Sequence, residues 1–258
     1  MTVNLKDEAE AIEKILRLRT FIVGLQFFEK AEDMERIKKL KRPGGRRVFC
    51  QIITTARTYG WTIGVTQEDL IKNSFCPAML GLYERPEFMR DGTYKGAIWF
   101  ENKEDGKKYE DSIPVIPLGK FHAVAIGPIF SERINPDIIL IYGNPAQMIL
   151  MVNGLQWKDY ERLTFYCAGE SSCADAIAQC YLSRKPSLTI PCYGERRFGH
   201  VQDDELVIAL PPDSLRKAAE GLKKLAEKGI RYPVPFFGVQ TDPNEGMPDI
   251  FKYYHLLK

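Results

Sequence analysis

The longest apolar stretch of the sequence, residues 137–152, is broken by the tripeptide Gly143-Asn144-Pro145. Before the break, Ile138–Tyr142 has the β-branched and aromatic composition of a strand. After it, Asn144 is a favoured N-cap residue and Pro145 suits the first helical position, which predicts a helix through Leu155. The stretch is therefore too interrupted to span a membrane, and it predicts a strand that turns directly into a helix.

Strand-like runs and helical periodicity alternate along the rest of the chain, which favours an α/β (or α+β) fold with a mixed β-sheet flanked by helices. Further strands are predicted at Phe21–Phe28, Ala123–Ile126, Leu163–Cys167, Ser187–Ile190 and Leu206–Leu210, with edge strands at Ile98–Phe100 and Ser112–Pro117. Helices are predicted at Asp7–Arg19, Ala31–Lys41 (helix or turn), Val48–Tyr59 and Asp213–Lys228, after the capping sequence Thr66–Asp69, and from Gly169-Glu170-Ser171-Ser172 to Leu182. The aromatic, proline-rich tail from Tyr232 is expected to pack across the body.

Length and charge narrow the class of protein. The 258 residues suit a single α/β domain over positions 1–258, with two lobes that meet near residue 120 as the alternative. Lys and Arg number 36 against 34 Asp and Glu, so a dedicated nucleic-acid-binding protein is disfavoured. The charged, amphipathic start does not resemble a signal peptide, and we expect a soluble, cytoplasmic protein without a membrane anchor. The sequence gives no indication of oligomeric state.

The chain has six cysteines and only three histidines. Neither C-x-x-C nor H-E-x-x-H occurs, which disfavours the common zinc sites. If a metal is bound, thiolates must dominate its ligation, and this points to iron–sulfur chemistry. The alternative for any single cysteine is a small apolar residue in the core.

Cys173 is predicted to lie in the first turn of the helix that follows Gly169. The free N–H groups of a helix start stabilise a thiolate, or bind a phosphate or carboxylate together with Ser171 and Ser172. Cys180 lies seven residues later, about 10 Å away by helix rise, and cannot share one metal ion with Cys173. We therefore interpret Cys180 as part of the core.

Cys192 is predicted to end a strand and to open a loop that contains Arg196, Arg197 and His200. The two arginines are candidates for clamping an anionic small molecule, and surface salt bridges with residues 203–205 are the equally plausible alternative. His200 is the histidine best placed to test as an acid–base group. The sequence contains no dinucleotide fingerprint, phosphate-binding loop or hydrolase elbow, so no nucleotide cofactor is predicted.

Two further cysteines precede these segments. Cys50 lies on a predicted helix beside Phe49 and Ile53, where a core role is the alternative. Cys76 is followed by Pro77, and a thiol followed by proline also ends runs of iron–sulfur ligands.

These segments together resemble a prokaryotic family catalogued as domain of unknown function one-six-nine, or "uncharacterised ArCR protein". In the first half, the resemblance is carried by Phe49-Cys50 through Arg57-x-x-Gly60 and by Phe75-Cys76-Pro77 to Leu80-Gly81-Leu82. In the second half it is carried by Pro136-Asp137, Asn144-Pro145-Ala146-Gln147, Ser172-Cys173-Ala174-Asp175, Pro191-Cys192-Tyr193-Gly194-Glu195-Arg196, Asp203-Asp204-Glu205 and the helix from Pro211 to Leu222. The family is common in anaerobic archaea and bacteria and has no established activity to carry over.

The cysteine positions of that family correspond to Cys50, Cys76, Cys173 and Cys192, while Cys167 and Cys180 are additional. Four cysteines equal the ligand complement of a 4Fe–4S cluster. The resemblance thus favours a cysteine-ligated iron–sulfur protein of anaerobic metabolism. Such a protein would transfer electrons or, with one iron open, act as a Lewis acid on an anionic small molecule.

Two alternatives remain open at the level of sequence. One is a metal-free binding module or thiol enzyme that captures a phosphate- or carboxylate-bearing ligand at the helix start of Cys173. The other is a structural subunit in which the thiols belong to the core. Whether the protein is an enzyme is not decided by these patterns.

Overall fold

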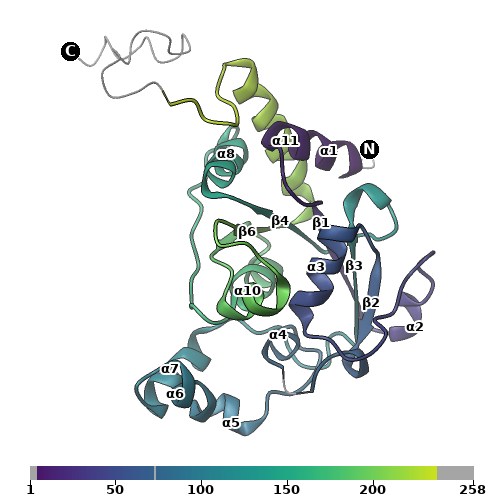
Figure 1. The fold of residues 1–258 in the computed structure, drawn as a ribbon, viewed down its shortest axis with the longest axis vertical. Coiled ribbons are helices and arrows are strands. Elements are labelled where there is room, and N and C mark those ends of the chain that lie inside the picture. The colour runs from purple at the N-terminus through teal and green to yellow at the C-terminus, as the bar shows by residue number, and fades with distance from the viewer. Residues whose placement is uncertain (1–4, 73, 237–258) are drawn as a thin grey trace.

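A six-stranded sheet with the strand order β2-β3-β1-β4-β6-β5 forms the centre of the computed structural model, which describes residues 5–72 and 74–236 (Figure 1). The strands are β1 Val23–Phe28, β2 Ile63–Thr66, β3 Ala123–Pro128, β4 Ile138–Gly143, β5 Ser187–Thr189 and β6 Leu206–Leu210. Every ladder between neighbouring strands is antiparallel. β1 and β2, which precede residue 120, are each paired with strands that follow it, so the described chain is one compact unit.

The sheet is covered on both faces, which explains the unbroken apolar run of β4. Ile138, Leu140 and Tyr142 point into one core cluster, whereas Ile139 and Ile141 point into the other. This alternation follows from the two-residue period of a strand. A strand buried on both faces reads as a continuous hydrophobic segment, whatever the direction of its neighbours.

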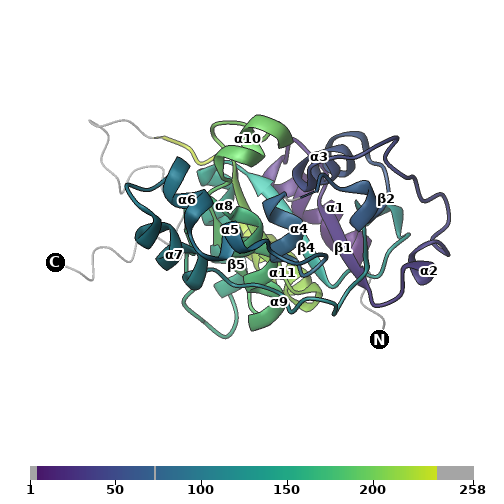
Figure 2. The same cartoon turned by 90° about the horizontal axis from the view of Figure 1, so that it is seen from below.

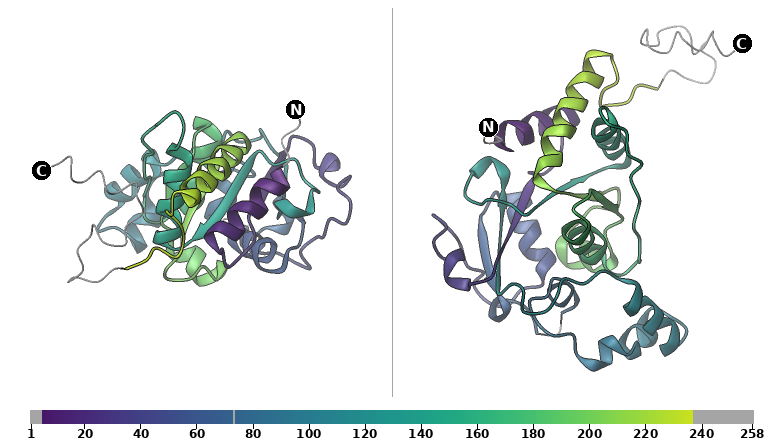
Figure 3. Two further views of the ribbon diagram at one scale, coloured as in Figure 1. Left: turned by 90° about the horizontal axis from the view of Figure 1, so that it is seen from above. Right: turned by 180° about the vertical axis from the view of Figure 1, so that it is seen from behind.

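Three long helices cover the first face of the sheet: α1 Leu5–Leu16, α8 Pro145–Gln156 and α11 Pro212–Glu227. Figure 3 shows α1 and α11 side by side above the strands, and the two helices are in contact. Their apolar faces are buried because Ile12, Leu16, Leu215 and Leu222 recur at helical spacing.

The second face carries α3 Phe49–Tyr59, a helical run over residues 172–183 and α10 Tyr193–Gly199. The run contains a π-helical segment, Ala174–Ala178, followed by α9 Gln179–Ser183. Figure 2 shows α10, α3 and the short helix α4 Phe75–Met79 close together, and α3 contacts both of the others. The ends of these helices position the candidate site.

A small group of helices projects beyond the sheet at the bottom of Figure 1: α5 Glu87–Arg90, α6 Thr93–Ile98 and α7 Lys103–Ser112. Gly92 permits the close packing of α6 against α7. It has a φ of 84°, and a Cβ atom there would lie 2.2 Å from the backbone nitrogen of Lys107. Only glycine fits this position without displacing the neighbouring backbone.

Several predicted elements are confirmed within a few residues. The helix expected at Val48–Tyr59 is α3, and it ends at Gly60 in the left-handed conformation with a φ of 70°. The Asn144 side chain caps α8 by accepting the backbone N–H of Gln147 at 2.9 Å. The strands at Phe21–Phe28, Ala123–Ile126, Ile138–Tyr142 and Leu206–Leu210, and the helix at Asp213–Lys228, are also present.

Other predictions need correction. Ile98 is the last residue of α6 and Ser112 the last residue of α7, so neither Ile98–Phe100 nor Ser112–Pro117 is an edge strand. The Asn102 side chain caps the start of α7 by accepting the Asp105 N–H at 2.8 Å. In Leu163–Cys167 only Phe165 pairs, through one bridge to Leu188. The region Ala31–Lys41 holds only the short helix α2 Ala31–Met34.

The sheet is antiparallel rather than mixed, and parallel pairing is confined to isolated bridges such as Lys41 with Ile63. The tail beyond residue 236 lies outside the described residues. Across the described chain no helix has both the length and the apolar character that crossing a membrane requires.

Candidate functional site

Four of the six cysteines lie at the beginnings of four different helices. Cys50 and Cys76 are the second residues of α3 and α4, and Cys192 is the N-cap of α10. Cys173 is the second residue of the helical run 172–183. The first four N–H groups of a helix have no partner within it, so each thiol lies near backbone donors. The Glu195 N–H is one such donor, and its contribution opposes the burial that raises the pKa of Cys192.

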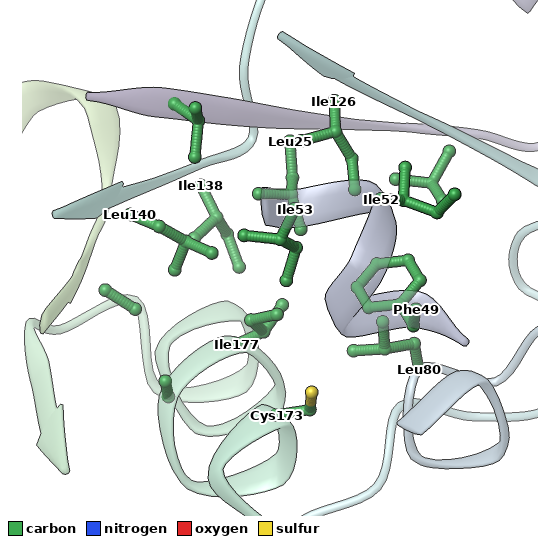
Figure 4. Packing of buried hydrophobic residues seen from close by; sticks show 14 of the residues in the cluster. Leu25, Phe49, Ile52, Ile53, Leu80, Ile126, Ile138, Leu140, Cys173 and Ile177 are labelled. Carbon is green, nitrogen blue, oxygen red and sulfur yellow. The ribbon is translucent and has the colours of Figure 1, made fainter. Parts of the chain in front are cut away.

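The fold brings these four thiols into one neighbourhood. Cys50, Cys76 and Cys192 line a single pocket of about 240 Å³. Cys173 lies behind it and interacts directly with the thiol of Cys76. Figure 4 shows Cys173 beside the core cluster that also contains Phe49, Leu80 and Ile177.

The other two cysteines lie apart from this group. Cys167 is exposed. Cys180 is buried among core residues, and Arg184 is the charged group that influences it. The division matches the distinction that the family resemblance draws between four common and two additional cysteines.

Burial and neighbouring groups raise the pKa of the Cys50, Cys173 and Cys192 thiols. Burial, with smaller contributions from Glu195 and Cys76, raises the pKa of Cys192 to about 11. The pKa of Cys50 is raised more, again mainly by burial. A hydrogen bond with Cys76, together with complete burial, raises the pKa of Cys173 well above its ordinary value. A metal cation reverses such shifts, because a coordinated thiol is deprotonated.

A buried carboxylate organises the wall of this pocket. Glu195, only 3% exposed, accepts a hydrogen bond from the Tyr142 hydroxyl at 2.8 Å and one from Ser172 at 2.5 Å. The Ser172 oxygen in turn accepts the backbone N–H of Cys192 at 3.2 Å. Burial raises the pKa of Glu195, while the two hydroxyl donors and Arg57 lower it. The network fixes the Cys192 helix start relative to the sheet.

A second buried pair supports the network from the opposite side. Arg57 donates to both carboxylate oxygens of Glu205, at 2.9 and 3.0 Å, and its guanidinium lies 4.2 Å from the Tyr142 ring centre. Sequence patterns did not identify Glu195, Tyr142 or Arg57 as site residues. A glutamate three residues after Cys192 was the one local signal, but its partner Tyr142 is distant in sequence.

The predicted anion-binding residues do not line the thiol pocket. Ser171 is fully buried, and its hydroxyl oxygen has no hydrogen-bond partner among the described residues. Ser172 belongs to the carboxylate network. Arg196 donates to the carbonyl oxygens of Gln202 and Glu205, and Arg197 donates to the Tyr193 hydroxyl at 3.4 Å. Both arginines thus stabilise the structure around α10.

His200 and Cys192 occupy helix ends rather than a loop. His200 is the C-cap of α10, in the left-handed conformation, and its carbonyl oxygen accepts from Arg57 at 3.5 Å. The loop predicted after Cys192 is the helix α10 itself. Binding of an anion by Ser171, Ser172, Arg196 and Arg197 stays a prediction.

The donor set matches an iron–sulfur centre, although the side chains do not form a ready metal site. In residues 5–72 and 74–236, no three His, Cys, Asp or Glu side chains form a group that holds a metal ion as they stand. Four thiols from four backbone segments are nevertheless the ligand set of a 4Fe–4S cluster. Ligation therefore requires the thiols to turn from one another towards a shared centre.

The family model DUF169, described as uncharacterised ArCR, matches residues 11–221, a range that includes all four clustered cysteines. The chain belongs to this family. It is 25% identical over 230 residues to the uncharacterized protein MJ0308 of Methanocaldococcus jannaschii, covering 86% of this chain and 96% of that protein. No solved structure matches the chain. The family and this relative are both described as uncharacterised, so the chemistry of the site must be argued from its residues.

Proposed function

We propose that this ArCR-family protein is an iron–sulfur protein whose cluster is held by Cys50, Cys76, Cys173 and Cys192. The observation that carries the proposal is that three of these thiols line one pocket and the fourth, Cys173, interacts with Cys76, each thiol coming from a different helix start. Cys167 and Cys180, which the resemblance leaves out of the expected ligand set, do not line this pocket. A core role alone does not require thiols from four separate segments to meet.

The surroundings of the thiols suit a 4Fe–4S cluster, which with its four thiolates is an anion. Backbone N–H groups at the helix starts donate towards sulfur and would tune the potential of such a centre. Core side chains such as Phe49 and Leu80 exclude water from one side. The cluster would supply one-electron transfer or, with one iron left open, Lewis acidity.

The chain's own residues have a positioning role in this proposal. The hydrogen bonds from Tyr142 and Ser172 hold Glu195, and Ser172 holds the Cys192 backbone. The α10 helix start is thereby fixed before any cluster is assembled. Pre-organised ligands lower the cost of ordering a site on binding.

Metal-free thiol catalysis at Cys173 has less support. A nucleophilic thiol needs a lowered pKa and a neighbouring base. The Cys173 thiol is instead completely buried and its pKa is raised, with Cys76, Glu195 and Cys192 as the titratable groups that influence it most.

The test is the iron and acid-labile sulfide content of protein purified without oxygen, with its visible spectrum. We expect about four irons and four sulfides per chain and a broad absorbance at about 400 nm. Serine substitutions at Cys50, Cys76, Cys173 or Cys192 should each lower the iron content and the absorbance. Cys167→Ser and Cys180→Ala are the matched controls and should retain both.

Either of two results would overturn the proposal. A folded, colourless protein that takes up neither iron nor sulfide after anaerobic reconstitution with ferrous iron and sulfide has no such cluster. Equal iron loss in the Cys167→Ser control would likewise contradict the assignment of ligands.

A further inference from the structure

The thiol pocket contains a buried lysine that forms no salt bridge with any acidic residue in the described part of the chain. Lys95, on α6, is only 2% exposed and lines the pocket with Cys76 and Cys192. Glu110, one of the nearby acids, is paired with Arg85 at 3.2 Å. Glu170, which also lines the pocket, influences Lys95 without forming a salt bridge in the described structure.

Aromatic rings surround the Lys95 ammonium instead. Its Nζ lies 4.2 Å from the ring centre of Phe75, 4.7 Å from that of Tyr109 and 5.9 Å from that of Tyr94. The faces of these rings attract an ammonium. They do not accept hydrogen bonds from its three N–H groups as carboxylate oxygens would. Burying an ammonium without an anion is costly, and such an arrangement in a pocket is typical of a binding group.

Aromatic side chains form a large part of the remaining wall of the pocket. Trp99 and Tyr193 meet edge to face with ring centres 5.7 Å apart, and their side chains are 40% and 54% exposed. Tyr94 and Phe198 also line the space and are partly exposed. Exposed aromatic rings beside the buried ammonium of Lys95 suit a ligand that is apolar at one end and negatively charged at the other.

We propose that Lys95 binds the carboxylate of a small, flat, largely apolar organic acid whose body lies against Trp99 and Tyr193. The volume of about 240 Å³ is below the range of about 300–1,000 Å³ that is usual for drug-sized ligands. The inference names the ligand class for the site of the proposed function. It rests on that function only for the chemistry that would follow binding.

The charges of the pocket favour one carboxylate over a phosphate ester. Lys95 is the one basic side chain among the described lining residues, whereas Glu170 and Glu195 both line the same space. The Lys95 ammonium can pair with one monoanion. The two glutamates repel a phosphate ester, with its charge of about −1.5 to −2, more strongly than a carboxylate.

The test is the binding of benzoate to the full chain. Calorimetry measures this binding for both the metal-free and the iron-loaded protein. Benzyl alcohol is the neutral analogue and phenyl phosphate the more highly charged one. We expect benzoate to bind at least tenfold more tightly than either. Equal affinity for benzyl alcohol, or no binding of benzoate to either form, would overturn the inference without any variant.

The variant Lys95→Met removes the charge and keeps the length of the side chain. It should weaken benzoate binding at least tenfold. Lys41→Met is the matched control, because Lys41 lies 3.4 Å over the Trp61 ring in a separate pocket. Circular dichroism establishes that both variants fold, and unchanged benzoate affinity in folded Lys95→Met would contradict the role of Lys95. If that variant does not fold, the comparison of benzoate, benzyl alcohol and phenyl phosphate on the unmodified chain tests the inference by itself.

The two proposals fail in different ways. Lys95→Met should keep the iron and sulfide of the unmodified protein, since Lys95 is not a ligand. If the protein takes up the cluster but neither form binds benzoate, the carboxylate site is contradicted and the cluster is not. If the protein takes up no iron or sulfide on reconstitution but binds benzoate through Lys95, the cluster is contradicted and the carboxylate site is not.

Discussion

At the scale of single residues, Glu195 is the group on which the geometry of the thiol pocket depends most. The sequence pointed to Cys192 and Ser172, because a thiol after a strand and serines at a helix start are local signals. It did not point to Glu195, whose partner Tyr142 comes from β4, 53 residues away. Contacts that join distant segments have no local pattern, so a buried carboxylate cannot be told from a surface one in the sequence.

We predict that Glu195→Gln destabilises the protein by about 1–3 kcal/mol, the usual cost of leaving a buried polar group badly paired. The amide has only one oxygen to accept from Tyr142 and Ser172, and its NH2 group faces a hydroxyl that already donates. Urea unfolding measures the loss. Tyr142→Phe is the milder comparison and should cost about 0.5–1.5 kcal/mol, since it removes one donor and keeps the carboxylate. An unfolding midpoint that Glu195→Gln leaves unchanged would show that the network contributes nothing.

At the scale of elements, prediction succeeded where local chemistry decides and failed where it does not. Asn144-Pro145 started α8 as expected, because a cap and a first-turn proline act within one turn. The helices α6 and α7 were not predicted, because α7 is short, highly charged and held to α6 through Gly92 and its neighbours. Tertiary packing of this kind overrides weak local propensity.

A titratable contact joins the turn between α5 and α6 to the first residue of α7. Asp91 accepts a hydrogen bond from Lys103 at 2.6 Å and one from the Thr93 N–H at 2.9 Å, and these lower its pKa from 3.8 to about 2. A carboxyl whose pKa is lowered on folding stabilises the folded state above its unfolded pKa. That stabilisation is lost as the pH falls from about 3.8 to about 2.

We therefore predict that Asp91→Asn is slightly less stable than the unmodified protein at pH 7 and that the difference disappears by about pH 2. Thermal unfolding across this pH range measures both stabilities. The contact is exposed, so added salt should shrink the difference. Glu101→Gln, which removes one exposed carboxylate nearby, is the control for the loss of a surface negative charge. A gap that persists at low pH would mean that the charge of Asp91 is not its cause.

At the scale of the whole molecule, the fold class was predicted and the strand directions were not. Alternating strands and helices indicate a sheet covered by helices, but a strand buried on both faces reads the same in parallel and antiparallel sheets. The meeting of the four cysteines depends on that topology. It brings α3 and α4 from the first half of the chain against the 172–183 run and α10 from the second.

The Arg57–Glu205 pair joins the same two halves, since its residues are 148 positions apart and almost completely buried. We predict that Arg57→Met destabilises the protein by about 3–5 kcal/mol, because it leaves the Glu205 carboxylate buried without its cation. Combining it with Glu205→Leu should recover much of that loss, because two apolar side chains leave no charge to compensate. Urea unfolding of the two single variants and the double variant gives the coupling free energy. Strictly additive losses would contradict this link, whereas strong coupling would show that the two halves that supply the thiols are held together by it.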